Sequence, residues 1–132
     1  MTVEAVQSRH QPLVVIADAD DDARLILPAA LRHAGYRCAP TANGEEALEV
    51  AERQGAALLI TELYLPARGR PCVVHAVKDR GASTSRLPVL VYTAHAMPED
   101  RQWALDAGCD VVLYKPTPVH DLLATVRRLL DR

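Results

Sequence analysis

The chain is organised around one stretch near its middle, AALLITELYLP, which covers residues 56–66. The first half of the stretch is apolar, follows Gly55 and turns polar at Thr61. This pattern is typical of a strand that is buried on both faces of a sheet. Glu62 comes directly after it, and a charged group at the end of a buried strand is costly to place unless it has a partner or a chemical task. Glu62 is therefore the first candidate site residue.

The composition predicts one soluble domain. The chain has 132 residues, of which 49% are hydrophobic, so a sizeable core is feasible. A formal net charge of -2 argues against a dedicated nucleic-acid or membrane-surface binder. No apolar run is long enough to span a bilayer and the N-terminus has no signal-peptide core, so we expect a cytoplasmic protein. We expect residues 1–11 to be a flexible N-terminus and residues 12–132 to form the single domain.

The cysteines, the histidines and the tryptophan give no sign of a metal or cofactor site. The three cysteines lie far apart without a CxxC pair, which predicts buried or half-buried free thiols in a reducing compartment. The five histidines are scattered with no ligand spacing. Trp103 is expected to pack within a helix rather than to hold a ligand.

Apolar runs alternate with helical patterns along the whole chain. The expected strands cover residues 13–17 and 37–42, a third segment that ends near Glu62, and residues 88–93 and 111–114. The expected helices cover residues 21–33, 45–54, roughly 71–80, 98–107 and a last segment that is capped by Thr117 with Pro118 at its first position.

The helix expected over residues 21–33 carries two specific predictions. Pro28 lies inside it and predicts a kink or a local break, because proline removes a backbone donor and clashes with the preceding turn. The inward face is expected to be made by four residues of the helix: Leu25, Ile26, Ala29 and Ala30.

Five strands that alternate with five helices predict a doubly wound parallel sheet with helices on both faces. Right-handed crossovers, together with Pro40 in an edge strand, favour the strand order 2-1-3-4-5. In such sheets, sites form beyond the carboxyl ends of the strands near the switch point. Polar groups fall at four of these ends: Asp18, Glu62, Thr93 and Lys115.

Each polar group on its own has a simpler explanation. Glu62 alone could be a solvated acid, Thr93 could bond local backbone, and Lys115 could be an ordinary surface lysine. The acids at residues 20–22 suit a helix start, because they face the positive end of the helix dipole. The shared position of four polar groups at the switch point favours a site over these separate explanations.

At this point the chain resembles the receiver domain of bacterial two-component response regulators, over residues 12–131. The resemblance implies a flavodoxin-like (CheY-like) fold and a phosphorelay role, in which a histidine kinase donates a phosphoryl group to an aspartate after the third strand. The motifs that carry it are VVIAD at 14–18, NGEEAL at 43–48, Glu62 with Pro66, Thr93-Ala94, Ala107-Gly108 and Lys115-Pro116.

The sequence departs from the family pattern at several site positions. The phosphoacceptor position holds Glu62, and the second acid after the first strand, normally a direct magnesium ligand, is replaced by Ala19. The aromatic switch position in the fifth strand matches Val112, and the loop glycine, Gly69, comes one place early. The family threonine and lysine are retained.

These departures predict weak magnesium binding and little or no phosphotransfer. Magnesium needs near-octahedral oxygen ligation, and Asp18 and Asp20 are the candidate ligands that remain, weakly bound or unoccupied. We expect an ion pair between Glu62 and Lys115 to hold the pocket without a cofactor. Glu62 would then imitate a phosphoryl group imperfectly, with one charge in place of about two.

The first functional hypothesis is a degenerate receiver that is not an enzyme and acts as a phosphorylation-independent protein-interaction module. Its expected partner is a histidine kinase or another signalling protein, and a homodimer through the fourth helix, fifth strand and fifth helix is a further expectation by family analogy. One alternative is a receiver that accepts a phosphoryl group from a histidine kinase. A flavin-binding enzyme of the same topology is disfavoured, because the acids after the first strand would repel phosphate.

Overall fold

The structure is a computed structural model that describes residues 11–131, so nearly all of the segment expected to be flexible lies outside the described residues. The strands are β1 (Leu13–Ala17), β2 (Arg37–Thr41), β3 (Leu58–Thr61), β4 (Val89–Thr93) and β5 (Val111–Tyr114). The helices are α2 (Asp21–His33), α3 (Gly44–Gln54), α4 (Val73–Lys78), α5 (Pro98–Ala107) and α6 (Val119–Leu130). None of these helices is long and apolar enough to cross a membrane.

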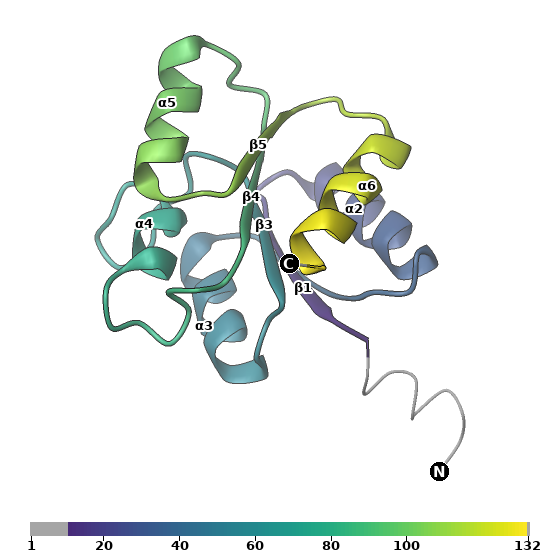
Figure 1. Ribbon diagram of the computed structural model, residues 1–132, viewed down its shortest axis with the longest axis horizontal. Coiled ribbons are helices and arrows are strands. Elements are labelled where there is room, and N and C mark those ends of the chain that lie inside the picture. The colour runs from purple at the N-terminus through teal and green to yellow at the C-terminus, as the bar shows by residue number, and fades with distance from the viewer. Residues whose placement is uncertain (1–10, 132) are drawn as a thin grey trace.

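The five strands form one parallel sheet in the order β2-β1-β3-β4-β5, which confirms the predicted topology. Helices α2 and α6 cover one face of the sheet, and α3, α4 and α5 cover the other (Figure 1). Strand β2 lies at one edge and carries Pro40, as expected from the missing backbone donor of proline.

The two faces of the sheet bury separate apolar cores. Along β1, Val14 and Ile16 join the core beneath α2 and α6. Val15 and Ala17 point the other way and join the core beneath α3, α4 and α5. All residues of β1 are buried, as a central parallel strand requires. This packing fixes the strand ends, and therefore the residues that follow them.

Helix α2 contradicts the predicted inward face and shows no local break at Pro28. The helix is continuous through Pro28, which is buried, so no break forms there. Leu25 and Ile26 face solvent with 72% and 66% of their surface exposed, while Leu27 and Leu31 are buried. The helix carries apolar residues on two faces, and helical periodicity alone does not say which face the sheet covers.

Two helix starts also differ from the predictions. Helix α4 spans only Val73–Lys78 instead of residues 71–80. Helix α6 begins at Val119, and Thr117 does not cap it. The Thr117 hydroxyl instead donates a hydrogen bond to the carbonyl of Tyr114 at 2.6 Å. Its role is therefore to close the turn after β5.

The turn between β2 and α3 depends on Gly44. The Asn43 side chain caps α3 by accepting a hydrogen bond from the backbone N–H of Glu46 at 2.8 Å. A Cβ atom on Gly44 would lie 2.4 Å from the carbonyl oxygen of Pro66, a contact too short for any other residue. The glycine therefore lets the α3 start pack against the loop that follows β3.

The cysteines are free thiols, as predicted. Cys72 and Cys109 are buried and Cys38 is half-buried. Burial raises the pKa of Cys109 to about 12 and that of Cys38 to about 11. Thiols with raised pKa values are poor nucleophiles near neutral pH, which is consistent with a packing role.

Candidate functional site

Backbone hydrogen bonds of the sheet bring four predicted residues to one edge. Asp18 follows β1, Glu62 follows β3, Thr93 ends β4 and Lys115 follows β5. The Glu62 N–H donates to the carbonyl of Ala17 at 2.9 Å, and the Lys115 N–H donates to the carbonyl of Thr93 at 2.9 Å. The pairing therefore continues one residue past the strands and holds these side chains at a common rim.

Lys115 is the centre of this rim. Its Nζ lies 2.6 Å from Oδ2 of Asp18 and 3.2 Å from Oε2 of Glu62. The predicted pair between Glu62 and Lys115 is thus present in the structure. The shorter contact with Asp18 was not predicted, because the sequence gives no distance across two strands. The same Nζ lies 5.6 Å from the centre of the Tyr92 ring, a further favourable contact for the cation.

The charge state of Lys115 follows from these contacts. Partial burial alone would lower its pKa, but the hydrogen bond and negative charge of Asp18, together with Glu62, outweigh burial. The pKa of Lys115 is therefore raised above its ordinary value. The ammonium group stays charged at neutral pH and balances two carboxylates.

The Glu62 carboxylate is held from two sides. The Thr93 hydroxyl donates to Oε1 at 2.6 Å, and the same hydroxyl oxygen accepts the N–H of His95 at 3.1 Å. The other oxygen, Oε2, is buried and makes no hydrogen bond, so the ammonium of Lys115 is the group that compensates it. The predicted site residues Glu62, Thr93 and Lys115 therefore form one connected network.

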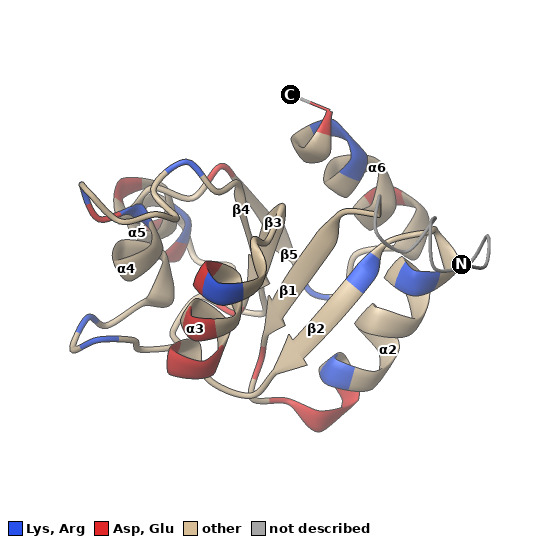
Figure 2. Cartoon of the chain, turned by 90° about the horizontal axis from the view of Figure 1, so that it is seen from below, with Lys and Arg blue, Asp and Glu red and all other residues tan. Residues whose placement is uncertain are grey.

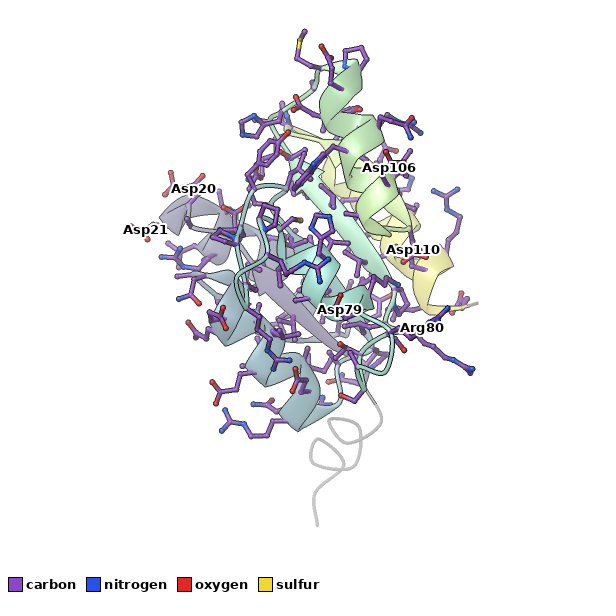
Figure 3. All side chains as sticks on the ribbon, turned by 90° about the vertical axis from the view of Figure 1, so that its left-hand side faces the viewer. Asp20, Asp21, Asp79, Arg80, Asp106 and Asp110 are labelled. Carbon is purple, nitrogen blue, oxygen red and sulfur yellow. The ribbon has the colours of Figure 1, made fainter. Side chains whose placement is uncertain are left out.

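Asp20 lies outside this network. It is the N-cap of α2, and its Oδ1 accepts the N–H of Asp22 at 3.0 Å. Figure 3 shows Asp20 and Asp21 together at the outer end of the molecule, at the start of α2. Asp18 is instead buried, and its Oδ1 accepts the Asp20 N–H at 2.9 Å. The acids after β1 thus serve two roles, one at the rim and one at the helix start.

Two ring-bearing residues near Glu62, His95 and Tyr64, were not predicted as part of the site. Nε2 of His95 lies 3.9 Å from Oε1 of Glu62. The His95 ring meets the Tyr64 ring edge-on at 4.8 Å, and Tyr64 lies 5.2 Å from Trp103. Tyr64 and His95 each come two residues after a site residue, and that spacing was the available signal.

Tyr64 joins the loop after β3 to α5. Its hydroxyl donates a hydrogen bond to the carboxylate of Asp100, and this bond is the main cause that raises the pKa of Tyr64 to about 12. Trp103 contacts both Tyr64 and His75, so its packing role is confirmed. A change at Glu62 can therefore reach Trp103 through the His95 and Tyr64 rings.

Thr93→Val is expected to lower the free energy of unfolding by about 1 to 3 kcal/mol, the range for a hydrogen bond to a charged group. The substitution keeps the shape of the side chain but removes the donor to Glu62. Urea unfolding measures the effect, and Thr93→Ser is the matched control because it keeps the hydroxyl. A loss in Thr93→Ser without a loss in Thr93→Val would show that packing of the methyl group, and not the hydrogen bond, matters here.

A parallel five-stranded sheet with acids, a threonine and a lysine at its carboxyl edge defines a receiver-type signalling domain. The model of the response regulator receiver domain matches residues 14–127. The chain belongs to the response regulator receiver family.

Individual relatives agree with this assignment. The chain is 32% identical over 121 residues to the transcriptional regulatory protein PrrA of Mycobacterium tuberculosis, covering 92% of this chain and 51% of PrrA. It is 24% identical to the sensor histidine kinase RcsC of Escherichia coli, over 99% of this chain and 14% of RcsC. Chemotaxis protein CheY4 of Vibrio cholerae superposes with a TM-score of 0.81 at 28% identity, covering 91% of this chain and 99% of that one. The chain spans about half the length of PrrA.

Proposed function

We propose that this receiver domain acts as a protein-interaction module whose state is not set by phosphorylation, and that it is not an enzyme. Receiver domains work in two-component signalling through contact with histidine kinases and other signalling proteins. The observation that carries the proposal is the network at Glu62. Thr93 and Lys115 hold the carboxylate at the acceptor position at 2.6 Å and 3.2 Å.

The Glu62 carboxylate is poorly placed as a phosphoryl acceptor. Glutamate is one methylene longer than the aspartate of the family, so its oxygens lie further from the strand end. Misplacement of a reacting atom by about 1 Å can reduce a rate roughly a hundredfold. Moreover, Lys115 is engaged by Asp18 and Glu62, so its charge is already neutralised within the protein.

The residues at this edge do not fit a magnesium ion. Ala19 has no side-chain oxygen, Asp20 caps α2, and Asp18 is paired with Lys115. Within residues 11–131, no three His, Cys, Asp or Glu side chains are grouped so that they could hold a metal ion. Near-octahedral oxygen ligation therefore lacks donors here, and we propose that magnesium binding is weak.

The arrangement supports a partial imitation of the phosphorylated state. The Glu62 carboxylate contacts the Thr93 hydroxyl and the Lys115 ammonium directly, so both groups already have an anionic partner. The imitation supplies one charge and two oxygens instead of about two charges and three oxygens. Val112 occupies the aromatic switch position of the family and is half-buried in β5, so a ring-based readout is missing at that position.

We propose α5, β5 and α6 as the contact face for the signalling partner, by analogy with the family. Strand β5 is an edge strand, and its four residues are only half-buried. The exposed part of α5 is polar, with Glu99, Arg101 and Gln102 on its surface. A homodimer through the same face is the related proposal.

The wild-type chain is expected to remain unmodified when it is incubated with phosphoramidate and excess magnesium chloride. Intact-mass measurement detects the addition of one phosphoryl group. In parallel, a magnesium titration can be followed by the fluorescence of Trp103, the only tryptophan in the chain, which contacts Tyr64 beside the site. A phosphoryl adduct on wild-type protein would support the alternative of a phosphorylatable receiver and overturn the proposal.

A further inference from the structure

Helix α2 carries an apolar face that has no partner within the described residues. The α2 stripe consists of Leu25, Ile26 and Ala29, which lie on the side opposite the buried Leu27 and Leu31. Leu25 and Ile26 are 72% and 66% exposed. Exposed leucine and isoleucine side chains that adjoin on one helix are an unusual surface, because burial of each would gain about 1.5 to 3 kcal/mol.

The α2 stripe continues into a groove beside the start of α6. The groove has a volume of about 330 Å³ and is lined by Ile26 and Ala30 of α2 and by Pro116, Val119 and Leu122. Val119 is itself 48% exposed. The exposed apolar side chains therefore continue from α2 to the start of α6 and are not isolated surface residues.

The charges at the two ends of α2 indicate what covers this surface. The first turn holds Asp21 and Asp22, and the last turn holds Arg32 and His33. All four residues are exposed, and Figure 2 shows acidic colour at the start of α2 and basic colour near its end. A second α2 that runs antiparallel places each acidic end against a basic end, whereas a parallel one places like charges together.

We propose that α2 is a self-association surface, through which two copies of this chain pack their α2 helices antiparallel about a twofold axis. The α2 stripe of each copy meets that of the other in the centre. Such an interface is self-complementary, as twofold symmetry requires. The interface does not require phosphorylation. Its test is therefore independent of the test of the proposed function.

The size of the surface sets the expected affinity. Helix α2 has 13 residues, which correspond to a length of about 20 Å. A contact of one helix pair with the adjoining groove lies at the small end of specific interfaces, where association is weak and transient. We expect a dissociation constant between about 10 µM and 1 mM.

Sedimentation velocity at protein concentrations up to about 1 mM is the first test. Wild-type protein is expected to show a monomer–dimer equilibrium, and Leu25→Glu is expected to weaken it at least about tenfold, because a charge would be placed at the apolar centre. Gln54→Glu is the matched control, since it adds the same charge at an exposed position on α3, away from the α2 stripe and from the proposed partner face. Circular dichroism melts confirm that both variants are folded.

A charge-exchange experiment tests the antiparallel orientation. Asp22→Arg and Arg32→Asp are each expected to weaken dimerisation alone, because each places like charges at both ends of the pair. Mixing the two variants is expected to restore association to near the wild-type level, since every contact in the mixed dimer then joins opposite charges.

Wild-type protein that stays monomeric at all concentrations would overturn the proposal and indicate that a different protein covers the α2 stripe. A dimer that Leu25→Glu does not weaken would also overturn it, by placing the interface away from the α2 stripe. Mixing that fails to restore association would exclude the antiparallel arrangement.

Discussion

The double variant Ala19→Asp/Glu62→Asp is expected to bind magnesium and to gain the mass of one phosphoryl group from phosphoramidate. The first substitution supplies the missing oxygen donor after β1. The second shortens the acceptor by one methylene and releases it from the contact with Thr93 at 2.6 Å. Because positioning dominates phosphoryl transfer, we expect the rate to exceed that of the wild type at least about a hundredfold.

The two single variants show what each substitution contributes to magnesium binding and to phosphorylation. Neither Ala19→Asp nor Glu62→Asp alone is expected to bind magnesium tightly, since each lacks one element of the site. Trp103 fluorescence reports binding and intact mass reports modification. If Glu62→Asp alone restored both, Asp20 would have to act as a ligand already, and its assignment as only a helix cap would be wrong.

The substitution Lys115→Met is expected to have the largest effect on stability at this site. It leaves the carboxylates of Asp18 and Glu62 at the rim without the cation that lies 2.6 Å and 3.2 Å from them. Removing one member of a buried ion pair typically destabilises a protein by about 3 to 5 kcal/mol. Because Lys115 is partly exposed, we expect about 2 kcal/mol in urea unfolding.

A second-site change distinguishes charge from packing. In the Lys115→Met background, Glu62→Gln is expected to recover at least half of the loss, because it removes one of the two unbalanced charges. Arg80→Met serves as the control at an exposed position, where a change below about 0.5 kcal/mol is expected. If the double variant showed no recovery, the unbalanced charge of Glu62 would not be the cause of the loss.

The same pair of proteins gives a pH dependence with a definite sign. The pKa of Lys115 is raised above 10.5 in the folded state, so folding favours the protonated form. The resulting stabilisation is fully present below about pH 10.5 and is lost as the pH rises through the folded pKa. The stability difference between wild type and Lys115→Met should therefore shrink above pH 10.5, and a difference that grew there would contradict the assignment.

The sheet and its rim were predictable because their causes are local in the sequence. Buried parallel strands appear as short apolar runs, and each run ends at a polar residue such as Glu62 or Lys115. Parallel pairing then places all carboxyl ends at one edge, whatever the details of packing. The predicted pair between Glu62 and Lys115 followed from this rule and is present at 3.2 Å.

Other features were not predictable, because they depend on which surfaces meet. Asp18 competes with Glu62 for Lys115 and makes the shorter contact, which depends on side-chain distances across the sheet. His95 was set aside because the histidines have no metal spacing, yet it lies 3.9 Å from Glu62. Its proximity arises from the loop that turns back after β4.

The sequence by itself determined the order of elements, the parallel sheet and the residues at its carboxyl edge, because strand periodicity and chain connectivity allow few other arrangements. Only the tertiary structure decided which face of α2 is buried and how three charged side chains share one rim. Leu25 and Leu27 are equally apolar, and only packing against the sheet leaves the first at 72% exposure and the second at 6%.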